Sequence, residues 1–441
     1  MKKTQRLLSL DVFRGLTIAG MILVNNAGSF PETYAPLRHA AWHGSTPTDW
    51  VFPFFLFIMG VAIPLAIGKR LSRGDTEGQI LGKIGVRALI IFGLGLLLTA
   101  MPHFGMEKRT GWLPTLHYLL LAVFFIAIFT RALIAGKKPG EATALDRQNR
   151  RKRIAGIAAL MVAAGTAIIG WQAYDLSSLR IPGVLQRIAV VYALCALLFI
   201  KVDWKGVAWI TAGILILYWI LLTVVPVPGG IAPNLEPETN LGAWLDRLLL
   251  GDHLWSYSET WDPEGILSTL PAVATGLSGV LTGLWIKTDR SDYQKITGMF
   301  AFGTLALAVG LIWNEAFPIN KSLWTSSYVA YTSGLALLGF ATTYWLIDRL
   351  GYRVWSQPFR VFGTNALFSY ILSILVTKVL IAIKVPGADG EQQSAFSWLY
   401  YEVFAPYLSG YNASLGFALA NVLFCLAVVW LLYQRRIYIK V

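Results

Sequence analysis

The chain has 441 residues, of which 56% are hydrophobic and 14% charged, and its formal net charge is +13. An average soluble domain carries about a quarter charged residues. The composition therefore excludes an ordinary soluble enzyme and indicates a polytopic membrane protein. Basic loops beside anionic headgroups explain the positive charge, so we expect a lipid bilayer and no nucleic acid as partner.

Apolar segments follow one another along the chain, each close to the ~20 residues that a helix needs to cross ~30 Å of hydrocarbon. We therefore predict an all-α membrane protein of about twelve transmembrane helices (range roughly 10–12) in a single domain, residues 1–441. The expected segments are 8–28, 50–68, 84–101, 115–135, 153–171, 182–201, 206–226, 265–286, 295–315, 323–347, 359–383 and 411–434.

The placement of the 37 Lys and Arg residues predicts the orientation, because cytoplasmic loops are enriched in both. With the N-terminus in the cytoplasm, most basic residues lie on that side, and both termini are expected there. All histidines then face outward: His39, His43, His103, His117 and His253. Proton-transfer chemistry is therefore expected toward the outer leaflet.

The polar stretch between the first two segments is the most informative part of the chain. It reads VNNAGSFPETYAPLRHAAWHGSTPTDWVFPFFLF, residues 24–57. Ionisable groups at a membrane boundary cost free energy, so they usually serve a site or a buried turn. His39 is either a loop histidine satisfied by backbone or a general base. Asn25, near the end of the first helix, reaches it only if the loop folds back. Thr48 or Asp49 is the expected N-cap of the second helix.

Other polar groups lie at the ends of later segments. Arg187, beside Gln186, needs a carboxylate or a ligand if it is buried. Asp262 and Glu264 either cap the eighth helix, with Pro263 in its first turn, or bind amino and hydroxyl groups of a sugar in an outer cavity. Asn320 and Lys321 precede a helix and form either an interfacial anchor with Trp324 or part of the site.

Loops between the segments complete the organisation. The outer loop 227–264 contains LGAWLDRLLLG, an amphipathic piece expected along the outer interface, and loop 385–410 is expected to cap the same side. Asp11 and Arg14 share a helix face and form either a structural pair or part of an anion site. Cys195 and Cys425 lie in predicted helices, so neither a disulfide framework nor a cysteine metal site is expected. A metal is not expected elsewhere.

These motifs together resemble the heparan-α-glucosaminide N-acetyltransferase family, including bacterial inner-membrane members linked to N-acetylglucosamine use. The matching text is LDVFRG, LVNNAG, RHAAWHGSTPTDWVFPFFLFIMG, IPGVLQR, DPEGIL and PINKSLWTSSYV, between residue 8 and about residue 375. The luminal domain of the animal enzymes has no counterpart, and segment 102–180 adds a helix pair. A polymeric acceptor such as heparan sulfate is therefore not expected.

The resemblance implies that acetyl passes from cytoplasmic acetyl-CoA to the amino group of glucosamine, or a related amino sugar, on the outer side. The family's active histidine falls on His39 and its partner asparagine on Asn25. Direct transfer and transfer through an acetylated His39 both remain open. The residues expected around the substrate are Asp262, Glu264, Gln186, Arg187, Asn320, Lys321 and Trp42. Arg14 and Arg87 are expected to meet the phosphates of acetyl-CoA.

Two other functions fit the same outer cavity. One is an amino-sugar transporter, although no internal repeat is found and many transporters are built from repeats. The other is an O-acyltransferase of envelope glycans. The oligomeric state is left open, with a homodimer as one candidate.

Overall fold

The computed structural model describes residues 7–100, 177–387 and 390–439, together with a few single positions between 123 and 168. In this part of the chain, regular structure is almost entirely helical. Two short strands, Lys384–Pro386 (β1) and Gln392–Ser394 (β2), form one antiparallel hairpin. The predicted all-α class is confirmed.

Eight of the described helices are long and apolar enough to cross a membrane, and a bent pair adds a ninth. The eight are α1 (Leu8–Asn25), α2 (Pro47–Leu71), α3 (Glu77–Ala100), α6 (Val184–Lys201), α7 (Trp204–Thr223), α9 (Ile266–Ile286), α10 (Asp292–Trp313) and α15 (Gly410–Gln434). The chain is thus a polytopic membrane protein. The total number of spans stays a prediction, because the expected segments 115–135 and 153–171 lie almost entirely outside the described residues.

Shorter helical elements fill the remaining segments. The predicted helix 323–347 is α11 (Ser326–Thr343), which continues into a π-helical turn at Tyr344–Arg349. The amphipathic piece of the long loop is α8 (Leu241–Leu250), as expected. Short helical turns occupy Ala35–Leu37, Val354–Ser356 and Leu399–Phe404, and α14 spans Ala395–Trp398.

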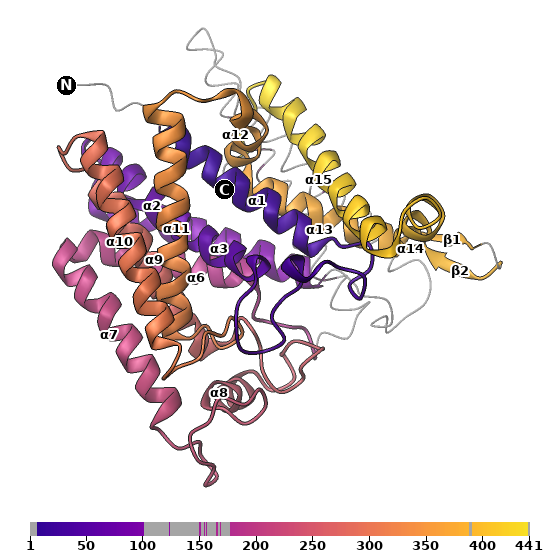
Figure 1. Ribbon diagram of the computed structural model, residues 1–441, viewed down its shortest axis with the longest axis horizontal. Coiled ribbons are helices and arrows are strands. Elements are labelled where there is room, and N and C mark those ends of the chain that lie inside the picture. Colours follow the sequence, from indigo (N-terminus) through magenta and orange to yellow (C-terminus); the bar gives the residue numbers. More distant parts are fainter. Residues whose placement is uncertain are drawn as a thin grey trace.

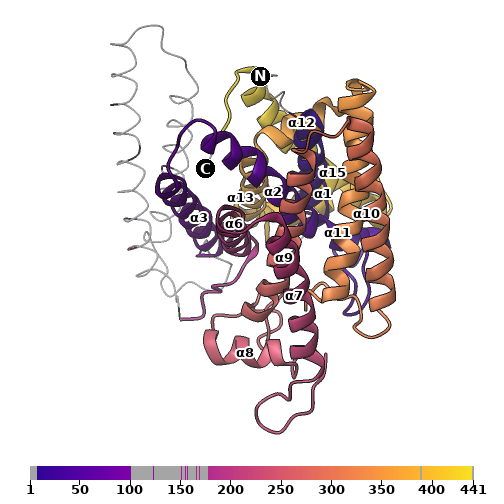
Figure 2. The same cartoon turned by 90° about the vertical axis from the view of Figure 1, so that its left-hand side faces the viewer.

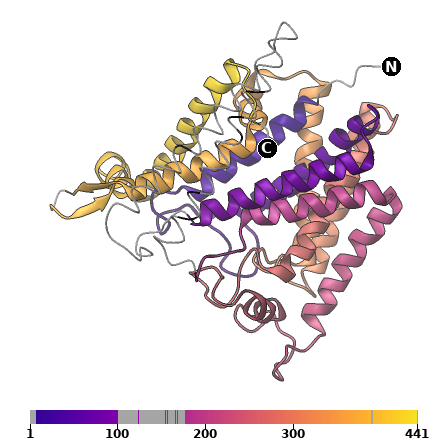
Figure 3. The same ribbon diagram turned by 180° about the vertical axis from the view of Figure 1, so that it is seen from behind.

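The helices form a bundle in which α2 and α9 are closely packed at the centre (Figure 1). A Cβ added to Gly60 would lie 2.0 Å from the carbonyl oxygen of Gly276, and one on Gly279 would lie 2.0 Å from that of Phe57. Glycine at these positions lets the two backbones meet, a common device in membrane bundles. Figure 3 shows α3 beside α6, and α10 lies beside α11 in Figures 1 and 2.

The predicted segment 359–383 is present but is not one straight helix, because the chain bends by 77° between α12 (Gln357–Thr364) and α13 (Ala366–Ala382). Asn365 stands at the bend and is buried. Its side chain donates to the Ile437 carbonyl and accepts from the Ile439 amide. The C-terminal segment is thus hydrogen-bonded to the break, a contact too distant in sequence for a hydropathy pattern to show.

Several loops meet at one end of the bundle. The Trp42 indole donates to the Leu235 carbonyl, Gly44 N–H donates to the Ile319 carbonyl, and the Tyr400 hydroxyl donates to Glu32. Loop 385–410 therefore does lie on the same side as the His39 loop. Figure 2 shows α8 at this end, opposite α12.

Candidate functional site: a histidine–aspartate pair beside a buried arginine

His39 forms a pair with Asp49. The two residues are 2.6 Å apart, from His39 Nδ1 to Asp49 Oδ1. Asp49 also accepts hydrogen bonds from the Ala40 and Thr46 amides, at 3.1 Å and 3.0 Å. A group that accepts from several N–H donors behaves as a carboxylate. His39 Nδ1 therefore carries a proton and donates it to Asp49, which leaves Nε2 as the basic nitrogen.

The start of α2 explains how Asp49 comes to face His39. Thr46 is the N-cap residue, Pro47 follows it, and Asp49 reaches back to the Thr46 amide in a capping box. The expectation that Thr48 or Asp49 is the N-cap is therefore wrong. Asp49 is 1% exposed and the His39 side chain is 51% exposed, so a buried carboxylate holds a histidine that remains accessible.

Lys321 lies on the other side of the imidazole. Its Nζ is 3.1 Å from His39 Nδ1, 3.4 Å from Nε2 and 3.7 Å from Asp49 Oδ1. Because Nδ1 donates to Asp49, only Nε2 can accept a proton from the lysine. Burial lowers the pKa of the Lys321 ammonium, and the opposing charges of Asp49 and Glu264 offset only part of this effect.

Trp42 and His43 connect the His39 loop to neighbouring loops at the same end of the bundle. The Trp42 ring packs edge-on against Trp261 at 5.1 Å between centroids. The Asn320 amide donates to His43 Nδ1 at 3.4 Å, and its oxygen accepts from the Leu323 amide. The predicted substrate residues Trp42, Asn320 and Lys321 therefore share one end of the bundle with His39.

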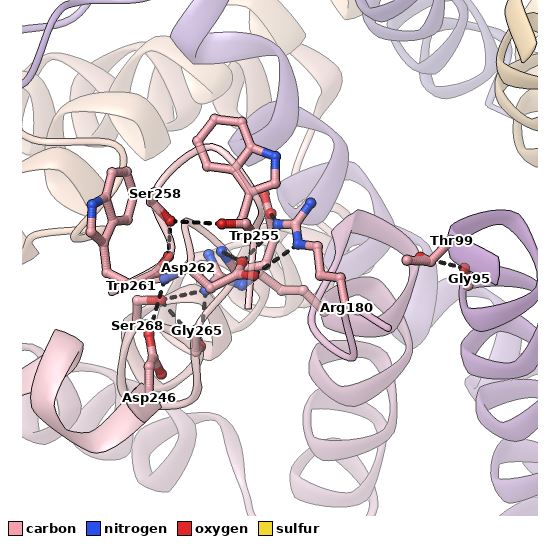
Figure 4. A network of polar contacts seen from close by, with 12 residues as sticks. Gly95, Thr99, Arg180, Asp246, Trp255, Ser258, Trp261, Asp262, Gly265 and Ser268 are labelled. Carbon is pink, nitrogen blue, oxygen red and sulfur yellow. Dashed lines mark hydrogen bonds and ion pairs between the residues drawn. The ribbon is translucent and has the colours of Figure 1, made fainter. Parts of the chain in front are cut away.

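Asp262 and Glu264 form a separate ionic cluster with Arg180. Arg180 Nε and Nη2 donate to both oxygens of Asp262, at 2.8 Å and 2.6 Å, and Nη2 also donates to Glu264 at 2.5 Å. Burial by itself lowers the pKa of Arg180, but the two carboxylates outweigh it and keep the guanidinium protonated. Figure 4 shows Arg180 between Asp262 and the ring of Trp255.

The position of this cluster corrects the capping hypothesis. Helix α9 begins at Ile266, with Gly265 as its N-cap residue, so Pro263 is not in its first turn. Asp246 of α8 takes the capping role instead, because its oxygens accept from the Ile266 and Asp262 amides. Burial is the main reason why the pKa of Asp246 is raised to about 6.

Arg187 is buried against the same segment but has no carboxylate hydrogen-bonded to it. Its Nη2 donates to the Gly265 carbonyl and the Ser268 hydroxyl, and its guanidinium carbon lies 5.0 Å from the centre of the Trp324 ring. Nε and Nη1 are buried and have no hydrogen-bond partner among the described residues, and neither does the side-chain nitrogen of Gln186. A buried N–H group without a partner costs about 1–3 kcal/mol, more when it is charged.

The two clusters are close enough to interact electrostatically. The charges of Asp49, Glu264 and Arg187 act on the Lys321 ammonium. Those of Glu264 and Asp262 act on the Arg187 guanidinium. The structure thus brings together His39 and Lys321 with Arg187 and the carboxylates. A base, an amine and buried N–H donors at one end of a bundle are suited to transfer of an acyl group.

Asn25 is placed differently from the expectation. It is the last residue of α1 and its side chain is exposed. No hydrogen bond joins it to His39 in the described part of the structure, so its role in the site stays a prediction. The neighbouring Asn26 is buried, donates to the Ile22 carbonyl and accepts from Thr377.

The two arginines expected to bind acetyl-CoA lie apart from His39. Arg14 forms the predicted pair with Asp11, at 3.6 Å, and donates to the Gly363 carbonyl. Arg87 is exposed on α3 and lies over the ring of Tyr192, 4.8 Å from its centre. Of these two guanidinium groups, that of Arg87 is thus the more accessible to a ligand. His103 and His117 lie outside the described residues.

Two functional candidates were missed from the sequence. Asp49 was interpreted only as a cap, although the pattern Thr46-x-x-Asp49 is a capping box that leaves one carboxylate oxygen for another donor. Arg180 was not among the residues predicted for the site. Its partners lie more than eighty positions away, and no local pattern signals that contact. No group of three or more potential metal ligands is found in the described ranges.

Comparisons with known proteins identify one family and two relatives. A family described as "Protein of unknown function (DUF998)" matches residues 16–203. Human heparan-alpha-glucosaminide N-acetyltransferase is 28% identical, over 83% of this chain and 52% of its own length. The mouse protein of the same name is 27% identical, over 83% of this chain and 53% of its own length. The chain is thus homologous to these N-acetyltransferases and spans about half the length of the curated relatives it matches.

Proposed function

We propose that this chain, as a homologue of the heparan-alpha-glucosaminide N-acetyltransferases, transfers acetyl from acetyl-CoA to the amino group of glucosamine or a related amino sugar. The observation that carries the proposal is the His39–Asp49 pair, because it provides an accessible base at the end of the bundle where the loops meet. We place the reaction in a bacterial inner membrane, with acetyl-CoA supplied from the cytoplasm and the sugar from the outer side.

In this proposal His39 acts as a general base. Asp49 fixes the proton on Nδ1, so Nε2 takes the proton from the acceptor amine as the amine attacks the acetyl carbonyl carbon. Asp49 also stabilises the imidazolium that forms. The new C–N bond replaces the C–S bond of the thioester, and His39 returns its proton to the departing thiolate.

The surrounding residues bind and orient the two substrates. Arg187 offers two unpartnered N–H donors to an oxygen of the acceptor or the acetyl group. The binding site for the acceptor sugar would be lined by Lys321, Asn320 and Trp42. It would also include the amide of Gln186 and the carboxylates of Asp262 and Glu264. Asn25 would polarise the thioester carbonyl. A pre-positioned donor of that kind contributes about 2.7–4 kcal/mol to a barrier.

Donor binding is assigned to the cytoplasmic half. Arg87 is exposed, and a guanidinium binds phosphate through charge-assisted hydrogen bonds. Arg14 would contribute a second positive charge near the break between α12 and α13. When bound there, acetyl-CoA supplies the activated acetyl group. A membrane-impermeant thiol reagent that labels a Ser45→Cys variant only after the cells are broken open would contradict this sidedness.

Turnover in detergent tests the function directly. Purified protein given acetyl-CoA and glucosamine should release one free CoA thiol per N-acetylglucosamine formed, without any gradient. His39→Ala should lower turnover by ~10²–10⁴-fold, whereas His43→Ala, the matched control in the same loop, should be much milder. Uptake of labelled sugar into proteoliposomes without acetyl-CoA, combined with no thiol release, would instead indicate a transporter. Acetate esters as the product would indicate an O-acyltransferase.

A further inference from the structure

The position of Lys321 is set by a tightly bonded turn between α10 and α11. The Lys321 carbonyl accepts from the Trp324 amide at 3.1 Å, and the Asn320 amide donates to the Thr325 hydroxyl at 3.0 Å. Trp324 is buried with φ = +55°, a left-handed conformation that costs a side-chain-bearing residue roughly 1–2 kcal/mol. Such a residue persists only where its surroundings over-determine it, so the turn holds Lys321 in place.

The amine of Lys321 lies against the imidazole of His39, at 3.1 Å from Nδ1 and 3.4 Å from Nε2. Of these two nitrogens, Nε2 is the one left free by the bond from Nδ1 to Asp49. Rotation of the flexible lysine side chain would bring Nζ from the ring to the lone pair of Nε2, where the general base can take its proton. The side chain is 23% exposed, so the amine is close to the base and is not sealed from a substrate.

The chemistry of this lysine matches that of an amino-sugar acceptor. Both offer a primary amine, and only the uncharged form of an amine is a nucleophile. Partial burial beside Arg187 disfavours the ammonium form, while Asp49 and Glu264 favour it. A surface lysine such as Lys83, which is paired with Asp75 in water, lacks both the burial and the neighbouring base.

We propose that Lys321 is an internal acceptor: its Nζ, held beside the general base, becomes acetylated when no amino sugar is bound. This inference rests on the proposed acetyl transfer. The lone pair of Nζ attacks the thioester carbonyl carbon, the C–N bond forms and the C–S bond breaks. The sulfur leaves with the electron pair, and His39 passes the proton from Nζ to it. One acetyl-lysine and one free CoA thiol result.

Such a modification would change the site in a defined way. It removes a positive charge beside Asp49 and fills the acceptor position with an acetamide, so acetylated protein should turn over poorly. An amino sugar should protect Lys321 by occupying the same place. The protein would then lose activity when acetyl-CoA is plentiful and the acceptor is absent.

Peptide mass spectrometry tests the inference. Full-length protein in detergent is incubated with acetyl-CoA alone, and acetylation is compared between Lys321 and the exposed Lys83 and Lys201, which serve as internal controls. Lys321 should be acetylated at least about tenfold faster than either control. Glucosamine should suppress this reaction, and His39→Ala should slow it by about 10²-fold. Lys321→Arg, which keeps the charge but cannot accept acetyl this way, should gain no acetyl group at this position.

The result is separable from the proposed function. If acetyl-CoA alone leaves Lys321 unmodified in a preparation that acetylates glucosamine once it is added, this inference is overturned and the function stands. Acetylation of Lys321 no faster than that of Lys83, or acetylation unaffected by His39→Ala, would also overturn it, as would acetyl found on His39 alone. If neither Lys321 nor glucosamine is acetylated, the proposed function fails and this inference fails with it.

Discussion

Arg180 and Arg187 contact the same short segment, residues 262–268, but only Arg180 is hydrogen-bonded to carboxylates. Arg187 is 2% exposed, yet two of its nitrogens have no partner among the described residues. A buried charge that is fully paired stabilises the site's shape, whereas a buried charge with vacant N–H groups costs stability until a ligand fills them. The comparison suggests that Arg180 supports the fold and Arg187 binds substrate.

The largest effect on stability is therefore expected at Arg180. Arg180→Met leaves Asp262 and Glu264 buried without their cation, and breaking a buried pair in this way costs about 3–5 kcal/mol. Thermal unfolding in detergent should show a markedly lower Tm than that of the wild type. An unchanged Tm would mean that the carboxylates find other partners and that the cluster is not structural.

Features set by neighbouring residues could be predicted from the sequence, whereas contacts between residues far apart in the sequence could not. The apolar segments predicted the described helices well, because each span must bury its backbone in hydrocarbon. The bend at Asn365 was missed, since the hydrogen bonds that hold this residue reach Ile437 and Ile439, far away in the sequence. The helix pair expected within 102–180 falls almost entirely outside the described residues and stays a prediction.

In the candidate site, too, local patterns were predicted and contacts between distant residues were not. The loop around His39 was identified from its polar residues and the family resemblance, and Arg187 was recognised because a buried arginine demands a partner. Sequence could not show that Arg180 takes both available carboxylates, which leaves Arg187 without one. Nor could it show that Asp49 faces His39, because that depends on how the intervening turn folds.

At Arg187 the comparison predicts the opposite behaviour. Arg187→Met should raise the KM for the acceptor about 10–100-fold, the equivalent of roughly 1.5–3 kcal/mol for a lost charged hydrogen bond. Its Tm should be unchanged or higher, because replacing an incompletely paired buried charge by an apolar residue is often neutral or stabilising. Steady-state kinetics and thermal unfolding on one preparation decide this. A large loss of Tm with a normal KM would make Arg187 structural like Arg180.

A smaller effect, on the pH dependence of stability, is expected from Asp246, whose carboxylate caps α9. Its pKa is about 6 in the folded protein and 3.8 as its ordinary value, so the folded state binds more protons between these two values. Stability should therefore fall as pH rises through this window and should be greater at pH 5 than at pH 7, by on the order of 1–3 kcal/mol. Asp246→Asn should reduce this slope. An identical pH dependence of Tm in the variant would rule out Asp246 as its source.

The central claim is that Asp49 makes His39 the base, and the kcat of Asp49→Asn tests it most directly. The amide keeps the size of the side chain but cannot hold the Nδ1 proton as a carboxylate does, so kcat should fall by about 10²-fold with little change in KM. Thr46→Ala is the matched control, because it weakens the same helix cap by about 1 kcal/mol and removes the hydroxyl's bonds to Asp49 Oδ2 and the Arg38 carbonyl, but keeps the carboxylate that faces His39. A kcat for Asp49→Asn close to that of Thr46→Ala and the wild type would contradict the account.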